Sequence, residues 1–243
     1  MTLATIVQLY PDELGVAGDR GNLLALAARL TAAGIDHQIV EYRRGETFPD
    51  RADAVIIGGG PLSAMRNVLD DLAAHGDRLR EWVDSGMPIF AYGSGAELLS
   101  HGIDLDDSAT LPGLGLFPFR ARRTKERKVG YVLVSTPTGQ LVGFEDNASV
   151  WTLDSGSDAL GTVTAGNGNG DGREGSITGA SMATQIGGPA LPLNPRLTDS
   201  LVASVALRLG VSTTPAVPAE IDEFARKARD VIIANAKHVF SRI

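Results

Sequence analysis

Residues 88–100 read PIFAYGSGAELLS, an apolar run that meets Gly-Ser-Gly and then a helical pattern. This order is typical of a buried parallel strand that turns sharply into a helix, and we call the unit the elbow. Such a turn holds one side chain above the free N–H groups of a helix N-terminus, where developing negative charge is favoured. Nucleophiles occupy this kind of turn. Here the apex residue is Gly93, which has no side chain, or Ser94, which has a weak nucleophile.

Strand-like and helical patterns alternate before the elbow. A Gly-Gly-Gly-Pro loop at residues 58–61 follows one of the strand-like runs. Glycine loops at the ends of alternating strands favour a parallel sheet that helices cover on both faces, so we expect an α/β fold. Any ligand should then lie beyond the carboxyl ends of the strands. The strand-like runs are 3–9, 37–42 and 54–57. The helical patterns are 23–30 and 68–83, and the second is expected to be a helical hairpin or a long helix that is interrupted near Gly76.

The second half of the chain has a different pattern. Shorter β-type runs replace the alternation, and they favour hairpins or meanders over crossovers. Residues 165–175 are so rich in glycine and asparagine that they are expected to form a loop. The β-type runs are 114–119, 129–134, 140–144, 150–153 and 160–164.

The C-terminal part is expected to be helical. Thr198 can cap a helix that reaches Leu209, residues 213–218 resemble a short linker, and apolar residues recur at helical spacing from Ile221 to Val239. We therefore expect one domain at residues 1–212 and a helical extension at residues 213–243. One interpretation packs this extension on the same domain, and the other makes it a partner-binding helix.

Composition narrows the range of functions. The chain of 243 residues has a formal net charge of −7, which gives no electrostatic reason to expect nucleic acid or an anionic membrane as a partner. It has no cysteine, so disulfides, thiolate zinc sites and thiol nucleophiles are excluded. No apolar stretch approaches about 18 residues, so no membrane span is expected. The apolar N-terminus reads as a first strand without the basic region of a signal peptide, and we expect a cytoplasmic protein without metal or cofactor.

Several motifs occur in an order that resembles a known family. The chain is similar, over residues 3–209, to class I glutamine amidotransferases of the cobyric-acid-synthase (CobB/CobQ-like) type, and within them to the glutaminase subunits of cell-wall precursor (lipid II) amidation. The resemblance implies a flavodoxin-like fold with a mostly parallel sheet. The matching motifs are Leu9–Asp12, Gly18–Asn22, Ile57–Gly60, Ala91–Leu99, Leu111–Leu116, Leu141–Glu145, Gly166–Gly175 and Gly188–Pro195.

The resemblance also implies a chemistry. In that family a cysteine on the elbow attacks the side-chain amide of glutamine, and a histidine before the late Gly-Pro acts as its base. Backbone N–H groups stabilise the tetrahedral oxyanion, and the ammonia passes to a partner that activates a carboxylate with ATP. The resemblance therefore implies a Mur-ligase-like or other ATP-dependent synthetase subunit as the partner, and glutamine or a related amino acid as a ligand.

This chain departs from the family at the positions that carry the reaction. Gly93 stands at the cysteine position, Gly187 at the histidine position, and Glu97 where the family usually has glutamine. The resemblance carries over Gly58, Gly59, Gly60 and Gly95 to the oxyanion or ligand site. Arg127, within the basic cluster from Arg120 to Lys128, is the positional match for the arginine that contacts glutamine.

Three hypotheses follow. The first is a glutaminase-like subunit that has lost its chemistry and serves an amide-forming ligase as a structural or regulatory partner. The second is an active enzyme that uses Ser94 or a group supplied by a partner. Its base would be one of four histidines, none of them placed like the base of a triad, and the ordinary role of Ser94 is a helix cap or turn. The third is a module that senses glutamine. The four histidines are His37, His75 in an expected helix, His101 and His238.

Overall fold

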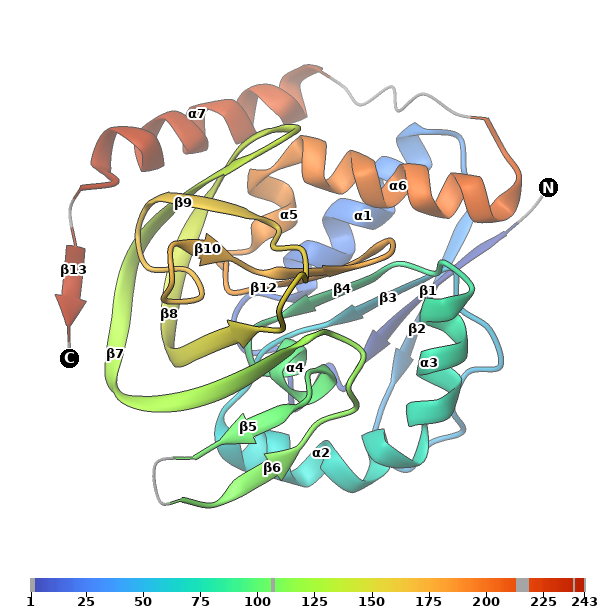
Figure 1. Cartoon of the computed structure of the whole chain (residues 1–243). Coiled ribbons are helices and arrows are strands. Elements are labelled where there is room, and N and C mark those ends of the chain that lie inside the picture. Colours follow the sequence, from blue (N-terminus) through green and yellow to red (C-terminus); the bar gives the residue numbers. More distant parts are fainter. Residues whose placement is uncertain (1–2, 106–107, 213–218, 238, 243) are drawn as a thin grey trace.

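The computed structural model describes residues 3–105, 108–212, 219–237 and 239–242 (Figure 1). Its centre is a six-stranded sheet in the order β11-β12-β4-β3-β1-β2, parallel except for β11, which runs antiparallel to β12. The elbow therefore lies in the middle of the sheet. The strands are β1 (Ala4–Leu9), β2 (His37–Tyr42), β3 (Ala54–Ile57), β4 (Ile89–Tyr92), β11 (Ser176–Thr178) and β12 (Ser181–Thr184).

Helices cover both faces of this sheet because its strands are apolar on both sides. In β1, Ile6 packs on one face against α1 and α6, and Val7 packs on the other against α2. The parallel α/β fold expected from the alternation is therefore confirmed. One face carries α1 (Arg20–Ala32), α5 (Ala190–Leu193) and α6 (Pro195–Leu209), and the other carries α2 (Leu62–Ala74), α3 (Gly76–Asp84) and α4 (Gly93–Leu99).

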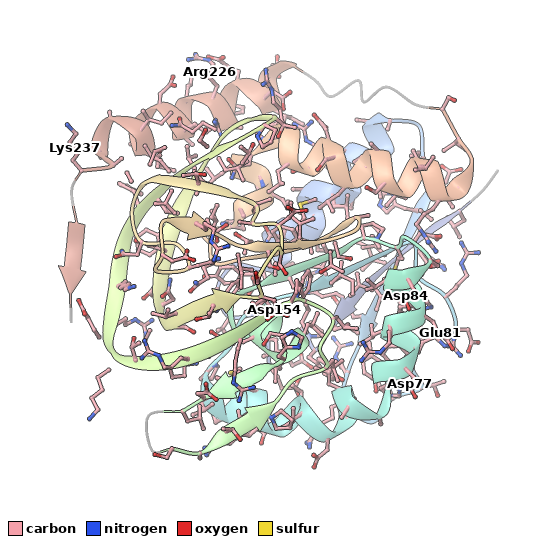
Figure 2. All side chains as sticks on the ribbon, viewed as in Figure 1. Asp77, Glu81, Asp84, Asp154, Arg226 and Lys237 are labelled. Atoms are coloured by element: carbon pink, nitrogen blue, oxygen red, sulfur yellow. The ribbon has the colours of Figure 1, made fainter. Side chains whose placement is uncertain are left out.

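The outer surface of α3 carries exposed charges of both signs, because Arg78 and Arg80 are exposed as well as three acidic residues. Asp77, Glu81 and Asp84 point away from the sheet in Figure 2, and all three are exposed. Leu79 and Trp82 form the opposite, buried side of this helix. Within the described ranges, no helix is both long and apolar enough to cross a membrane.

A long hairpin dominates the second half of the chain. The short β-type runs expected from 129 to 153 are parts of two long strands, β7 (Phe119–Thr136) and β8 (Gly139–Leu153), which curve around one end of the main sheet (Figure 1). Their register shifts between Arg123 and Lys128, which leaves a bulge in β7. Their sheet also contains β5 (Gly102–Asp104), β6 (Thr110–Pro112), β9 (Gly161–Ala165), β10 (Arg173–Glu174) and β13 (Val239–Arg242).

The expected β-type run at 114–119 is wrong except for Phe119, which begins β7. The N–H groups of Leu114 and Leu116 donate to the carbonyls of Leu98 and Leu99. The α4 helix has only seven residues, so its last carbonyls need partners from outside the helix. The loop after β6 supplies these donors and thereby closes the end of the elbow helix.

Two buried carboxylates organise the glycine-rich loop expected at 165–175. Glu145 accepts hydrogen bonds from the backbone N–H groups of Asn167 and Gly168. Glu174 is fully buried and accepts from the Thr184 hydroxyl at 3.1 Å and from the Gln185 N–H at 2.7 Å. Burial raises the pKa of Glu174 to about 7, although these hydrogen bonds favour the ionised form.

The C-terminal helix α7 (Ala219–Asn235) lies across the tip of the β7–β8 hairpin (Figure 1). Ile232 packs against Leu133 and Val142, and Arg29 of α1 forms ion pairs with Asp199 of α6 and Asp222 of α7. The separation of the chain into units 1–212 and 213–243 stays a prediction, and the expected linker at 213–218 lies outside the described residues.

The helix expected to reach Val239 ends earlier. It stops at Asn235, and Val239 begins β13, which pairs with β7 opposite Gly130. The apolar spacing alone could not show whether residue 239 continues the helix or forms a strand, because pairing with a distant strand overrides local helical preference.

The buried carboxyl of Glu174 predicts a pH dependence of stability. The pKa of Glu174 is higher in the folded state than in the unfolded state. Its contribution to the free energy of unfolding is therefore fully present below pH 4.5, the ordinary pKa, and is lost as the pH rises through about 7. The wild type should lose up to about 3 kcal/mol of unfolding free energy between these pH values, and Glu174→Gln should not show this loss.

The measurement is urea unfolding of both proteins at pH 4.5 and pH 8. Glu46→Gln, which changes an exposed carboxyl, controls for net charge. An equal change in the unfolding free energy between the two pH values in wild type and Glu174→Gln would contradict the assignment.

Candidate functional site

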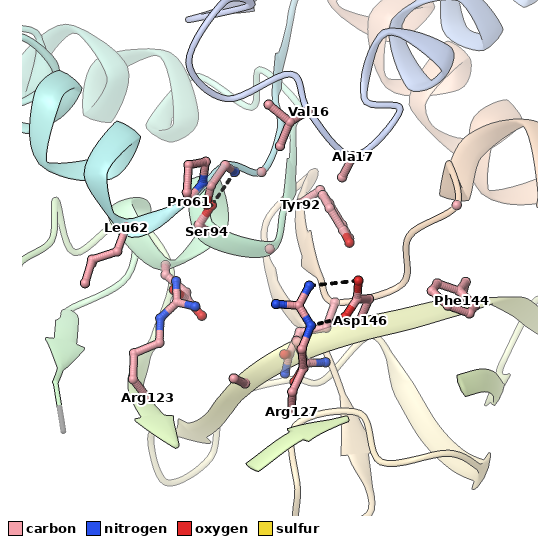
Figure 3. Close-up of a pocket in the computed structure, with 18 residues that line it drawn as sticks. Val16, Ala17, Pro61, Leu62, Tyr92, Ser94, Arg123, Arg127, Phe144 and Asp146 are labelled. Carbon is pink, nitrogen blue, oxygen red and sulfur yellow. Dashed lines mark hydrogen bonds and ion pairs between the residues drawn. The ribbon is translucent and has the colours of Figure 1, made fainter. Parts of the chain in front are cut away.

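A cavity of about 700 Å³ lies at the carboxyl ends of β3 and β4, between the elbow, the glycine loop and the β7–β8 hairpin (Figure 3). Gly59 and Gly60 line it from the glycine loop, and Gly93 and Ser94 from the elbow. The β8 strand contributes a wall that includes Phe144. Segments that lie far apart in the sequence therefore meet around one space.

Gly93 has the backbone geometry of a nucleophile turn. Its φ of +53° lies in the left-handed region, which glycine adopts at little cost. A Cβ placed on Gly93 would meet no atom within 4 Å among the described residues, apart from its immediate neighbours. The position is therefore open to the cavity but carries no reactive group.

Gly187 differs from Gly93, because a neighbouring side chain fills the space beside it. A Cβ on Gly187 would lie 2.5 Å from the Tyr92 hydroxyl and 2.9 Å from its Cζ. The same ring would lie 3.1 Å from a Cβ on Gly59. The Tyr92 ring thus stands between the glycine loop and the late Gly-Gly-Pro loop. Burial raises the pKa of Tyr92 well above its ordinary value, and the negative charges of Asp19 and Asp146 add to the effect.

The N–H groups of the glycine loop are held by side chains. Gly59 donates to Asp19 Oδ2 at 3.1 Å, and Gly60 donates to Ser94 Oγ at 2.7 Å. The Ser94 hydroxyl in turn donates to the Gly60 carbonyl at 2.8 Å. The N-cap residue of α4 is Tyr92 and Ser94 lies inside the helix, so of the two ordinary roles expected for Ser94, a helix cap or a turn, the cap is wrong. Its side chain joins the elbow to the glycine loop.

Gly58 and Gly95 lie behind this wall of the cavity. A Cβ on Gly95 would come within 2.2 Å of the Gly58 carbonyl oxygen. The two segments can approach this closely only because residue 95 has no side chain. Of the four glycines expected in an oxyanion or ligand site, Gly59 and Gly60 line the cavity, while Gly58 and Gly95 provide the contact that sets their position.

Asp19 is a buried carboxylate beside the glycine loop. Its Oδ2 accepts from Gly59 and from Ala17, while its Oδ1 is buried and has no hydrogen-bond partner in the described structure. Burial raises the pKa of Asp19 to about 6, although the two backbone N–H groups lower it. The Asp19 carboxyl group holds the Gly59 N–H through Oδ2.

Both arginines of the cavity form ion pairs, and Figure 3 marks the one between Arg127 and Asp146 with dashed lines. Arg127 binds Asp146 through two hydrogen bonds of 2.6 and 2.9 Å, and this carboxylate raises its pKa. Arg123 binds Glu97 at 2.5 Å. Glu97 is 2% exposed and also accepts from Trp151 Nε1 at 3.2 Å, so the position forms a buried ion pair between elbow and hairpin. The basic cluster therefore contributes neutralised charges to the site.

The described histidines lie elsewhere. No histidine is among the residues that line the cavity in the described part of the chain. His101 binds Asp154 at the surface, and His37 begins the edge strand β2. His75 lies between α2 and α3, at the helix interruption expected near Gly76, and its ring forms a hydrogen bond with the Tyr42 hydroxyl. The fourth histidine, His238, lies outside the described residues.

Reasoning from sequence missed four side chains that shape the cavity. Tyr92 directly precedes the elbow glycine, and an aromatic residue there was the only local signal. The pairing of Asp146 with Arg127 depends on the register of the hairpin, which the bulge shifts. Asp19 lies within the motif Gly18–Asn22 and Arg123 within the basic cluster from Arg120 to Lys128, but neither pattern predicts the partner of its side chain. Among the described residues, no group of three or more His, Asp and Glu side chains could hold a metal ion.

Comparison with known proteins gives two relatives of nearly full length. The chain is 32% identical over 238 residues to the GatD subunit of a lipid II isoglutaminyl synthase (glutamine-hydrolyzing) of Staphylococcus aureus, with 96% of each chain covered. It is 26% identical over 206 residues to the GatD subunit of Streptococcus pneumoniae, covering 82% of this chain and 79% of that protein. The first alignment leaves out only 4% of this chain, so it extends into α7.

Solved structures and a family model agree with these relatives. A glutamine amidotransferase crystal structure covers 84% of this chain and 99% of its own, with a TM-score of 0.52 and 21% identity. The glutaminase domain of Trypanosoma brucei CTPS, with bound acivicin, covers 87% and 96%, with a TM-score of 0.53 and 11% identity. Both show the shared fold. The model of the CobB/CobQ-like glutamine amidotransferase domain matches residues 5–192. The chain therefore belongs to the CobB/CobQ-like glutamine amidotransferase family.

Proposed function

We propose that this chain is a GatD-like subunit that has lost glutamine hydrolysis and serves an ATP-dependent amide-forming ligase as a structural or regulatory partner. The ligase is of the Mur-ligase, MurT-like kind, and the complex works in the cytoplasm on lipid II or a related peptidoglycan precursor. The observation that carries the proposal is the pair of glycines at the nucleophile and base positions, Gly93 and Gly187, in a chain that has no cysteine.

The chemistry explains why this pair matters. Hydrolysis of a carboxamide needs a nucleophile that forms an acyl intermediate and a base that shuttles its proton. Neither glycine has a group for these roles, and the N–H groups of Gly59 and Gly60 are held by Asp19 and Ser94. An oxyanion would have to compete with a carboxylate and a hydroxyl for these donors. The nucleophile, the base and the loop donors therefore all argue against hydrolysis.

The relatives support the role as a subunit. Both GatD proteins are named as subunits of a synthase, and the similarity of this chain to one of them covers 96% of both proteins. A protein that loses its own chemistry can retain the surface that binds its partner, because packing and interface residues are separate from the reacting groups. We propose that α7, as part of the extension at 213–243, belongs to the same unit as the rest of the chain.

The second candidate, an enzyme with Ser94 as its nucleophile, has less support. The Ser94 hydroxyl makes hydrogen bonds with both the N–H and the carbonyl of Gly60. Activation of a serine needs a base within hydrogen-bond distance, and the described histidines His37, His75 and His101 do not line the cavity. An active enzyme would need a base from the partner chain.

The third candidate, a glutamine sensor, depends on Arg127. Its guanidinium already binds Asp146 through two hydrogen bonds, so a ligand carboxylate would have to replace an internal one. Arg123 is likewise paired with Glu97. The two ion pairs sum to no net charge, which gives an amino acid little electrostatic gain on entering.

The hydrolysis experiment tests the proposal directly. We expect the purified chain to release no ammonia or glutamate from glutamine above the blank, while an active GatD relative in the same assay does. Release above background would overturn the proposal. Ser94→Ala then separates the causes, because loss of that release in the variant would establish Ser94 as the nucleophile.

A thermal unfolding experiment tests the sensor candidate. We expect 10 mM glutamine to leave the Tm of the wild type unchanged, because both arginines in the described lining of the cavity are already paired with carboxylates. A ligand at 100 times its Kd would stabilise the native state by about 2.7 kcal/mol, which is a shift of several degrees for a chain of this size. A rise in Tm that Arg127→Ala abolishes would favour the sensor.

A further inference from the structure

Tyr92 differs from the other residues around the cavity because it occupies space that a missing side chain would need. Gly187 is outside the left-handed region, so its backbone would accept a side chain without conformational strain. What excludes a side chain there is contact: the Tyr92 hydroxyl lies 2.5 Å from the Cβ position. The obstacle at residue 187 is therefore a neighbour and not the local fold.

The backbone of Gly187 cannot easily move away from this contact. Gly187 N–H donates to the Phe144 carbonyl at 2.7 Å, and Phe144 N–H donates to the Gly187 carbonyl at 3.1 Å. This two-bond bridge ties the late loop to β8. Movement of residue 187 would break both hydrogen bonds.

The Tyr92 ring is also fixed from behind. Tyr92 is the last residue of β4, and its backbone pairs with Thr184 of β12. On the far side the ring packs against the glycine loop, where a Cβ on Gly59 would already be 3.1 Å from Cε1. The Gly59 N–H is held in turn by Asp19. The ring is therefore held between the glycine loop and the late loop, and its open side faces the cavity.

We propose that Tyr92 is an internal plug that fills the place of the family's base and prevents a side chain at residue 187 from reaching residue 93. The proposal rests on the proposed loss of glutaminase activity and deepens it. The two glycines remove the reacting groups, and Tyr92 reshapes the cavity so that restoring both groups does not restore their contact. Tyr92 is thus a positioning residue that determines which groups can meet in the cavity.

A double-mutant cycle on stability tests the contact. We expect Gly187→Ala to lower the Tm by about 3 °C or more in the wild type, because the added methyl group overpacks against the ring. In a Tyr92→Ala background the same change should cost little. Tyr92→Phe removes only the closest atom, so it should relieve part of the cost and serves if Tyr92→Ala folds poorly. Gly130→Ala is the matched control, since a Cβ there meets nothing within 4 Å in the described structure.

A thiol-reactivity experiment tests the functional consequence. The chain has no cysteine, so Gly93→Cys introduces a single thiol at the open elbow position. An ordinary cysteine thiol has a pKa of about 8.5, and a neighbouring imidazolium lowers this pKa. More of the thiol is then in the reactive thiolate form at pH 6, so alkylation is faster. We expect Gly93→Cys/Gly187→His to react with iodoacetamide at the rate of Gly93→Cys alone. Addition of Tyr92→Ala to the pair should raise the rate about tenfold or more.

The outcomes separate this proposal from the proposed function. Equal Tm costs of Gly187→Ala with and without Tyr92, or equal alkylation rates of the double and triple variants, would overturn the plug. Neither result depends on glutamine hydrolysis by the wild type, which the ammonia assay measures separately. A wild type that hydrolyses glutamine would overturn the loss of activity even if the cycle confirmed the contact.

Discussion

The site depends on one close approach between backbones, that of the elbow and the glycine loop. A Cβ on Gly95 would lie 2.2 Å from the Gly58 carbonyl oxygen, and a Cβ on Gly58 would lie 2.3 Å from Asp19 Cγ. Any side chain at these two glycines would push the three segments apart. Their contact brings Asp19 to the Gly59 N–H and Ser94 to Gly60. We propose that this is the geometry of an oxyanion site, retained here without the reacting groups.

The two loop donors and both arginines of the cavity have partners within the chain, while Asp19 Oδ1 and Arg123 Nε are buried without one in the described structure. Ser94 and Asp19 hold the loop donors, Asp146 holds Arg127, and Glu97 holds Arg123. Hydrogen bonds and ion pairs of this kind fix the positions of loops and strands, because breaking one leaves a buried group without a partner. We interpret the site as a former reaction centre whose interactions now stabilise the junction of the main sheet with the β7–β8 hairpin.

The sequence was sufficient for the fold but not for the shape of the cavity. Strong alternation before residue 100 predicted the parallel sheet, and the ordered motifs predicted the family, because both depend on local patterns. The length of β7 and the end of α7 at Asn235 depend on pairing between distant segments. The plug at Tyr92 depends on a contact with Gly187, which is 95 positions away and carries no local signal. The sequence therefore predicted that Gly93 and Gly187 lack reactive side chains, but it did not predict that the Tyr92 ring occupies the space beside Gly187.

The most direct test is the nitrogen source of the complex that we propose this chain to form. The chain would be purified from its native host under conditions that retain a bound ligase, and ATP-dependent amidation of the lipid-linked precursor would be followed with ammonium salt or with glutamine as the donor. The account predicts that a ligase co-purifies and that amidation proceeds with ammonium but not with glutamine. Amidation that proceeds equally well with glutamine, from a complex that contains no other glutaminase, would contradict it.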